Sequence, residues 1–287
     1  MTAGFAAALS QAQAKISTHM DMRLPQADLL HEAMAYALRG GKMLRGFLVL
    51  ESARLHDVPE AAALEAALAI ECIHAYSLVH DDLPSMDDDD LRRGQPTLHR
   101  KWDEATAVLA GDSLQTFAFE LLARDEVGPH ALPLIRTLAQ AAGKDGMVSG
   151  QMLDIAAESA ATPLTLDQIT TLQARKTGCL IEWSACAGAR LAGADPEPLR
   201  HYAQALGLAF QIADDILDIE GDAATVGKAV RKDADAGKAT FVSLLGLEGA
   251  KSRAQELAQL ASTALSPYGA AGETLKDAAR FVISRDS

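Results

Sequence analysis

Six aspartates fall between residues 81 and 90, directly after an apolar helical run and one residue before two arginines. Hard divalent cations prefer carboxylate oxygens, and magnesium is usually held by one or two carboxylates together with oxygens of a substrate phosphate. A cluster of this density repels itself unless a cation is bound. The stretch therefore indicates a magnesium and diphosphate site, although most isolated acidic runs are solvated surface.

A second pair of aspartates lies in the apolar helical stretch 211–218, QIADDILD. Asp214 and Asp218 are four residues apart, and Gln211 comes three residues before Asp214. A helix places these three side chains close to one face. The repetition of acidic groups on a second helix favours shared cation binding over a merely solvated loop.

Pro84 interrupts the first cluster, and we expect the helix that carries Asp81 to end just after Asp82. An unbroken helix would turn Asp87 about 120° away from Asp81, whereas Asp88 would return to the face of Asp81. A loop after the proline allows either residue to fold back. An EF-hand calcium loop is excluded, because the cluster contains no DxDxDG series followed by a glutamate at its twelfth position.

Basic residues precede the cluster in the stretch 40–46, GGKMLRG. Two glycines allow a turn, and Lys42 and Arg45 are then expected at i, i+3 on one side of the next helix, near its N-terminus. His74 lies seven residues before Asp81, which is two helical turns along the same face. These side chains predict a site for an anion.

These motifs together resemble the short-chain trans-isoprenyl diphosphate synthases, and most closely the bacterial farnesyl diphosphate synthases. The resemblance runs from GGKMLR at 40–45 to KATF at 238–241 and so covers almost the whole chain. A lone DDxxD motif would be weak support, but two such motifs in order, with basic motifs between and around them, are specific. The resemblance implies an all-α fold of the isoprenoid synthase type, with helices around a central cavity.

The resemblance also implies a role for individual residues. The magnesium ligands would be Asp81, Asp87 and Asp214, holding about three ions, with Asp82 and Asp88 as second choices. The diphosphate of isopentenyl diphosphate would be bound by Lys42, Arg45, His74 and Arg93. Catalysis at the allylic diphosphate would involve Arg92, Lys176 and Thr177, and the remaining substrate-binding residues would be Gln211, Lys228 and Lys238.

Other residues near these motifs are expected to support the site. Gln151 and Asp154 match a GQxxD helix motif that lines the cavity in the family. His80 is expected to be structural. We expect the last two aspartates of the cluster, Asp89 and Asp90, to be solvated or paired with Arg92 or Arg93.

The implied reaction is a magnesium-dependent, head-to-tail condensation of isopentenyl diphosphate with dimethylallyl and geranyl diphosphates, which gives farnesyl diphosphate. Geranylgeranyl and geranyl diphosphates are the alternative products. A class I terpene cyclase and a non-catalytic helical subunit are rival interpretations, but the cyclase should lack the basic set around Lys42 and the subunit should have lost one aspartate cluster. The resemblance further implies a homodimer.

Product length is expected to depend on Tyr76 and Ser77, which lie five and four residues before Asp81. The growing tail extends along the helix from Asp81 toward its N-terminus, so both residues lie roughly 5 to 7 Å below the diphosphate. Serine leaves room there, and tyrosine is bulky enough to form a floor. In the resembling family this pairing of a small and an aromatic residue accompanies a fifteen-carbon product.

Two positions depart from the family pattern. Gly46 replaces the proline that usually follows the arginine, and we expect a looser turn there because glycine is more flexible. Phe241 and Val242 stand where an aromatic-proline pair is common, which puts the hinge after Lys238 in doubt.

Composition and periodicity predict the elements that position these groups. Hydrophobic residues make up 49% of the 287 residues but aromatic residues only 5%, so an alanine-rich core of closely packed helices is expected. Apolar residues recur with helical spacing and strand-like alternation is absent, which predicts an all-α chain of roughly ten helices. No linker-like stretch divides the sequence, so residues 1–287 are expected to form a single polyprenyl synthetase domain.

The charge excludes several partners. A net charge of −13 argues against binding to nucleic acid or to an anionic membrane surface. The start of the chain does not resemble a signal peptide, and no continuous apolar run is long enough to predict membrane insertion. Cys72, Cys179 and Cys186 lie in apolar stretches without CxxC spacing and indicate a reducing, cytoplasmic location.

Overall fold

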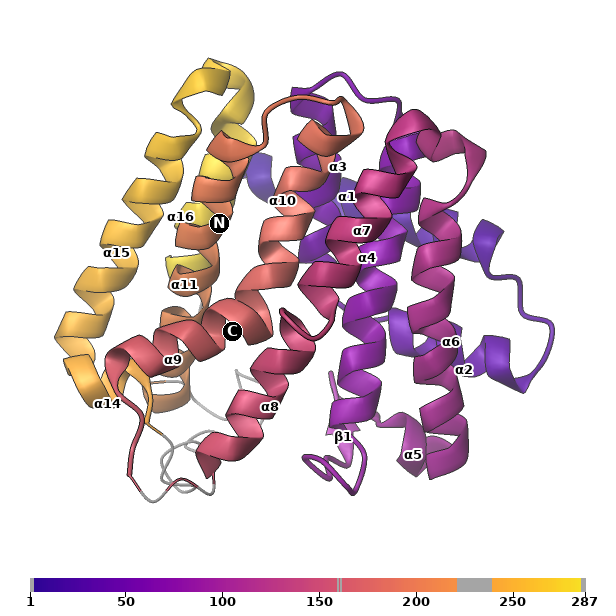
Figure 1. The fold of residues 1–287 in the computed structure, drawn as a ribbon, viewed down its shortest axis with the longest axis horizontal. Coiled ribbons are helices and arrows are strands. Elements are labelled where there is room, and N and C mark those ends of the chain that lie inside the picture. Colours follow the sequence, from indigo (N-terminus) through magenta and orange to yellow (C-terminus); the bar gives the residue numbers. More distant parts are fainter. Residues whose placement is uncertain (1–2, 159, 161, 221–238, 285–287) are drawn as a thin grey trace. The chain divides into compact units, whose positions relative to one another are not determined.

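The computed structural model describes residues 3–158, 160, 162–220 and 239–284. Nearly all of them are helical, which confirms the predicted all-α class (Figure 1). The α-helices are α1 (Ala3–Arg23), α2 (Leu29–Leu38), α3 (Leu44–Leu55), α4 (Glu60–Asp81), α5 (Leu98–Lys101), α6 (Glu104–Leu122), α7 (Ala131–Ala142), α8 (Met147–Glu158), α9 (Leu166–Gln173), α10 (Cys179–Leu191), α11 (Glu197–Glu220), α14 (Phe241–Leu245), α15 (Leu247–Ala264) and α16 (Glu273–Ser284). The short elements are the 3₁₀ helices η1 (Asp125–His130) and η3 (Ser266–Gly272), the π-helix η2 (Ala174–Gly178), and the strands β1 (Leu91–Arg92) and β2 (Gln95–Pro96).

The described residues group into two compact units, each drawn from separate parts of the sequence. One unit comprises Ala7–Ile135 and Ala187–Ala194, and the other is formed by Met1–Ala6, Arg136–Cys186 and Asp195–Ser287. We call them the α4 unit and the α11 unit, after the helix that carries the aspartate motif in each.

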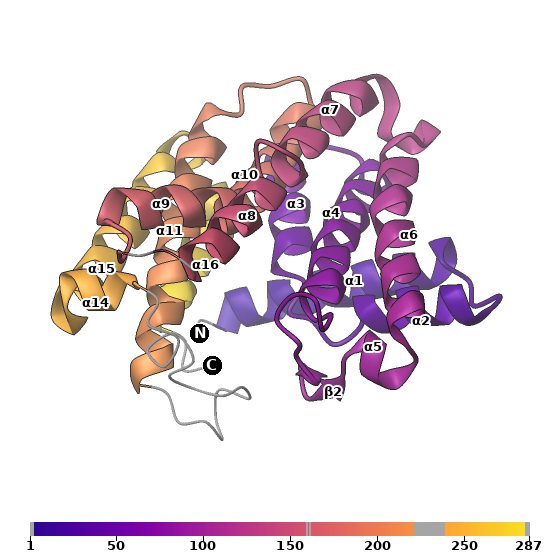
Figure 2. The same ribbon diagram turned by 60° about the horizontal axis from the view of Figure 1, so that its bottom comes forward.

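Helix α4 is the core of its unit and packs against α3 and α6 (Figures 1 and 2). Its buried face is rich in alanine, including Ala66, Ala67 and Ala69, which are fully buried. Small side chains allow the neighbouring helices to approach closely, as the aromatic-poor composition predicts. This helix is long and apolar enough to cross a membrane, but 78% of its most apolar window is buried in the structure.

In the α11 unit, α11 packs against α15 and α16 (Figure 1). The hydroxyl of Tyr202 on α11 donates a hydrogen bond of 2.8 Å to the backbone oxygen of Leu275 on α16. Helix α8 packs directly on the π-helix η2. The second aspartate motif and the helix turn of Lys176 are therefore held by a common packed core.

The two-stranded hairpin β1–β2 is the one described element type that periodicity did not predict. Arg92 pairs with Gln95, which leaves Arg93 and Gly94 as a two-residue loop. Both loop residues have positive φ, +54° and +73°, as a type I′ hairpin turn requires. The hairpin lies beyond the C-terminal end of α4 (Figure 2).

Candidate active site

The acidic loop folds back on the end of α4. The helix ends at Asp81 with Asp82 as its C-cap, which confirms the break predicted from Pro84. The backbone N–H of Asp87 then donates a hydrogen bond of 2.9 Å to the backbone oxygen of Asp81. The loop therefore returns Asp87 to Asp81, and two carboxylates that a continuous helix would separate start from adjacent backbone.

Asp82 and Asp88, the second choices for metal binding, have different environments. Asp82 is 3% exposed, and its carboxylate accepts a hydrogen bond of 2.9 Å from Nε of Arg92. Burial raises the pKa of Asp82, although the hydrogen bond from Arg92 opposes this. Asp88 is exposed at the tip of the loop with a φ of +50°. Asp82 thus serves as the counterion of Arg92.

The hairpin directs its two arginines to different partners. Arg92 contacts Asp82 and Asp89. Arg93 instead donates a hydrogen bond of 3.1 Å to the backbone oxygen of Arg39 and lies against Gly41, where an added Cβ would come within 2.8 Å of the guanidinium. Gly41 is therefore needed for this close approach, and Arg93 reaches the GGK motif.

The last two aspartates of the loop are held in place. Asp89 pairs with Arg92 at 3.4 Å, as predicted, but Asp90 pairs with Arg100 and not with Arg92 or Arg93. The buried hydroxyl of Thr97 donates a hydrogen bond of 2.8 Å to the backbone oxygen of Asp89. Thr97 fixes the end of the loop, a role that the sequence analysis missed.

Arg45 and Arg93 bring two positive charges close to His74. Burial and then the charges of Arg45, Arg93 and Arg92 hold the pKa of His74 well below its usual value, so its imidazole is neutral at neutral pH. Burial also lowers the pKa of Arg45, with Glu71 opposing and Arg93 adding to the shift. No described residue accepts a hydrogen bond from the buried Nε of Arg45. This arginine is a preformed donor for an anion.

Lys42 differs from its predicted position. The prediction of Lys42 and Arg45 together on one helix is wrong, because α3 begins only at Leu44. Met43, the N-cap, has a φ of +48°, so the exposed Lys42 lies in the turn before the helix while Arg45 lies in its first turn. Both still flank the helix N-terminus, where unpaired N–H groups favour anions.

Gly46 is inside α3 and not in a loose turn, so the expectation of a looser backbone is wrong. Its N–H donates a hydrogen bond of 2.8 Å to the carboxylate of Glu71, which is 7% exposed. An added Cβ would lie 2.5 Å from Cδ1 of Ile16. Burial raises the pKa of Glu71, opposed by the Gly46 N–H and by Arg45 and Arg93. Proline, the usual family residue, could not donate this bond.

Replacing Gly46 by proline is therefore expected to destabilise this chain more than replacing it by alanine. Both substitutions crowd Ile16 at a cost of about 1–3 kcal/mol, which helix propensity partly offsets for alanine. Only proline also removes the donor to buried Glu71, which costs about 1–3 kcal/mol more. Urea denaturation followed by circular dichroism measures the difference. Equal stabilities of the two variants would show that the hydrogen bond contributes nothing.

In the α11 unit, Lys176 lies on the π-helix η2 against α8. Its Nζ is 2.6 Å from Oδ2 of Asp154, the aspartate of the GQxxD motif. Gly150 allows α8 and η2 to approach closely, since an added Cβ at this position would lie 2.1 Å from the backbone N of Lys176. Lys176 and Thr177 thus occupy a locally widened helix turn, a feature frequent at functional sites.

Gln211, Asp214 and Asp218 all lie on α11, as predicted. Asp215, the other aspartate of the pair, has a structural contact: its carboxylate accepts a hydrogen bond of 2.7 Å from the backbone N–H of Phe241. That bond fixes the start of α14, where Phe241 and Val242 are buried. This segment is therefore anchored even though Val242 stands where a proline is expected from the family pattern. Lys228 and Lys238 lie outside the described residues.

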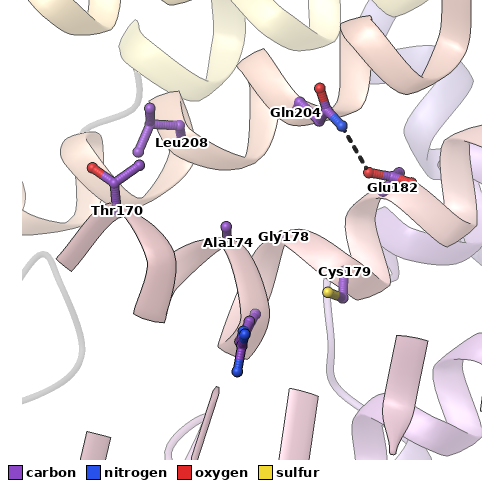
Figure 3. Close-up of a pocket in the computed structure, with 8 residues that line it drawn as sticks. Thr170, Ala174, Gly178, Cys179, Glu182, Gln204 and Leu208 are labelled. Carbon is purple, nitrogen blue, oxygen red and sulfur yellow. Dashed lines mark hydrogen bonds between the residues drawn. The ribbon is translucent and has the colours of Figure 1, made fainter. Parts of the chain in front are cut away.

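A cavity of about 390 Å³ is lined by residues of α9, η2, α10 and α11 (Figure 3). Its lining includes Ala174, Gly178, Cys179 and Leu208, and a hydrogen bond of 3.1 Å joins Gln204 to Glu182 at its edge. Neither Lys176 nor Thr177 lines it.

Comparison with known proteins decides the family. Residues 27–271 match the polyprenyl synthetase family. The chain belongs to this family. It is 44% identical over 302 residues to a farnesyl diphosphate synthase of Haemophilus influenzae, and the match covers 99% of each protein.

Solved structures of similar proteins have the same fold. An FPP/GFPP synthase from Zymomonas mobilis is 44% identical, with a TM-score of 0.89 over 99% of this chain and 100% of the other. A geranyltransferase from Helicobacter pylori, complexed with magnesium and isoprenyl diphosphate, is 33% identical, with a TM-score of 0.83 over 99% of this chain and 98% of the other. These matches confirm the predicted isoprenoid synthase type of fold.

The carboxylates of this polyprenyl synthetase fit magnesium. Among the described residues, no three His, Cys, Asp or Glu side chains gather closely enough to enclose an ion. Magnesium does not need such a cage, because it is usually bound by one or two carboxylates with waters and substrate phosphate oxygens. The half-buried Asp81 and the exposed Asp87, joined through their backbones, provide such a pair.

Proposed function

We propose that this polyprenyl synthetase condenses isopentenyl diphosphate with dimethylallyl and geranyl diphosphates to form farnesyl diphosphate. The observation that carries the proposal is that acidic and basic side chains lie close together in the α4 unit. Asp87 folds back onto Asp81 at the end of α4, and Arg92 on β1 pairs with the neighbouring Asp82. Burial and then the charges of Arg45, Arg93 and Arg92 lower the pKa of His74, which places these arginines near His74. A site for a cation beside a site for an anion suits two substrates that each carry a diphosphate.

The residues have distinct roles in the proposed reaction. Lys42, Arg45, His74 and Arg93 bind the diphosphate of isopentenyl diphosphate and hold its double bond in place. Asp81, Asp87 and Asp214 would hold magnesium, as about three ions, which would supply positive charge to the allylic diphosphate. Further groups at that diphosphate are Arg92, Lys176, Gln211, Lys228 and Lys238.

The chemistry then follows from charge stabilisation. The allylic C–O bond breaks, and its electron pair leaves with the diphosphate, whose new charge is stabilised by Arg92 and Lys176. The double bond of isopentenyl diphosphate attacks the allylic cation and forms a carbon–carbon bond, while the oxygens of Thr177 face the cation. The released diphosphate takes the proton lost from the product. Apolar walls exclude water, which would otherwise capture the cation.

The proposal includes the assembly of the protein. The chain passes between the two units within α1, α7 and α10, which supports one polyprenyl synthetase domain over two linked ones. A homodimer is proposed, and the exposed Val108 and Leu109 on α6 are available apolar side chains for such a contact.

We also propose a cytoplasmic location, which the absence of disulfides among Cys72, Cys179 and Cys186 supports.

Incubation of the purified protein with isopentenyl and dimethylallyl diphosphates and magnesium tests the reaction. Linear products of ten and fifteen carbons are expected, and omission of magnesium should abolish them. Cyclised hydrocarbon would instead indicate a terpene cyclase, and no turnover would indicate a non-catalytic subunit. Either of these results would overturn the proposal.

Product length is expected to change with Tyr76 and Ser77. Tyr76 is 6% exposed, and the half-buried Ser77 donates a hydrogen bond of 2.9 Å to the backbone oxygen of His74. Tyr76→Ala removes the floor and should extend the product to twenty carbons or more, whereas Ser77→Phe should shorten it to ten. Chromatography of the dephosphorylated products measures both. A wild-type protein that already makes mostly the twenty-carbon product would contradict this assignment.

A further inference from the structure

The aromatic ring of Tyr76 has a neighbour that the proposed reaction does not use. The imidazole of His80, one helical turn further along α4, meets the Tyr76 ring edge to face, with centroids 5.8 Å apart and planes at 74°. Tyr76 and His80 are four residues apart and so lie on one face of α4, next to the face that carries Ser77 and Asp81. His80 therefore contacts the proposed floor residue directly.

His80 is itself fixed against α6. Its Nε2–H donates a hydrogen bond to the backbone oxygen of Val108, over a distance of 3.1 Å. Gly111 leaves the space for its ring, because an added Cβ there would lie 2.1 Å from Nε2. Asp112 Oδ1 is 4.0 Å from the same nitrogen. The imidazole thus fills the gap between Tyr76 and the backbone of α6.

The Tyr76 side chain is held by packing and by one weak polar contact. Its hydroxyl is buried and makes no hydrogen bond of normal geometry to a described residue, but the side chain of Gln115 on α6 lies near enough to oppose the rise in the pKa of Tyr76 that burial causes. His80 is a ring neighbour of Tyr76 and also contacts α6. Removal of such a neighbour leaves space into which the Tyr76 ring can relax in part.

We propose that His80, packed between Tyr76 and Gly111, is a positioning residue that keeps the Tyr76 ring under the growing tail and so limits product length. The inference rests on the proposed prenyl transfer and on Tyr76 as its floor. His80 acts only through Tyr76 and touches no substrate. Gly111 takes part because any larger residue would displace the imidazole toward Tyr76.

The test compares product distributions of three variants at one fixed ratio of isopentenyl to allylic diphosphate. His80→Ala opens space beside Tyr76 and should raise the ratio of twenty- to fifteen-carbon product by about tenfold or more, since pocket size discriminates chain lengths on this scale. Gly111→Ala should act in the opposite direction and raise the ten-carbon share, because it pushes His80 toward Tyr76. Tyr76→Ala, measured in parallel, tests whether Tyr76 limits the length of the growing tail. A ratio of products is independent of any loss of overall rate.

The outcomes separate this inference from the proposed function. Longer products with Tyr76→Ala but an unchanged distribution with His80→Ala would overturn the role of His80 alone. An unchanged distribution with Tyr76→Ala would overturn the floor, and a lack of prenyl products from the wild type would overturn the reaction. If circular dichroism shows that the Gly111→Ala variant does not fold, the product distribution of His80→Ala alone tests the role of His80. Longer products from a folded Gly111→Ala would contradict the proposed direction of displacement.

Discussion

Replacement of Asp81 by alanine is expected to lower kcat by about 10²- to 10³-fold or more. In the proposed reaction this carboxylate holds the cations that stabilise the leaving diphosphate, and loss of one preorganised charge-stabilising group costs about 3–4 kcal/mol of transition-state stabilisation. The fold should persist, because the backbone oxygen of Asp81 still accepts the hydrogen bond from Asp87. Steady-state kinetics at saturating magnesium, with circular dichroism as the check on folding, measures both.

Asp90→Ala is the matched control for this substitution. Asp90 lies in the same acidic loop and is exposed, and its carboxylate pairs with Arg100. Its removal takes away the same charge from the loop without removing a proposed metal ligand, so activity should stay within a few-fold of the wild type. Near-normal turnover of the Asp81 variant, or an equal loss in both variants, would contradict the assignment of Asp81.

Replacement of Arg45 by glutamine is expected to raise KM for isopentenyl diphosphate by about 10- to 100-fold. Hydrogen bonds to charged groups contribute about 1.5–3 kcal/mol each, and the buried Nε of Arg45 has no described acceptor that could compete with the substrate. The KM for geranyl diphosphate should change by less than about threefold, because Arg45 is assigned to one of the two diphosphates. Initial rates with each substrate varied in turn give both constants.

Two further arginines provide comparisons for this prediction. Arg93→Gln should reproduce the selective effect, because the charge of Arg93 lowers the pKa of Arg45, and both arginines lower the pKa of His74. Arg100→Gln removes a surface arginine that pairs with Asp90, and both KM values should stay unchanged. Equal increases for both substrates in the Arg45 variant would refute the division into two diphosphate sites.

Much of the fold could be predicted, because the relevant signals are local. Pro84 predicts the end of α4, since proline removes a donor and clashes with the preceding turn, and the helix does end there. Helical spacing places Gln211 and Asp214 on one helix, which α11 confirms. The motifs predicted the polyprenyl synthetase family, and the comparisons confirm it.

The errors lie where a position depends on distant contacts. The hairpin has strands of two residues, too short to show alternation, and its turn places Arg93 rather than a second glycine at positive φ. The spacing of Lys42 and Arg45 predicts both on one helix, because the left-handed conformation of Met43 gives no sequence signal. At Gly46 the sequence indicates only flexibility, since nothing local predicts that its N–H meets Glu71, a residue on another helix.

In the proposed reaction, Asp81 and Asp214 act on one diphosphate. A double-mutant cycle of Asp81→Glu and Asp214→Glu, followed by the single-turnover rate with geranyl and isopentenyl diphosphates, tests it most directly. If both carboxylates hold the same cations, the second substitution costs much less once the first is present, and the two losses deviate from additivity by about 1 kcal/mol or more. Losses that add to within about 0.5 kcal/mol would mean that the two motifs act independently, and would contradict the shared site.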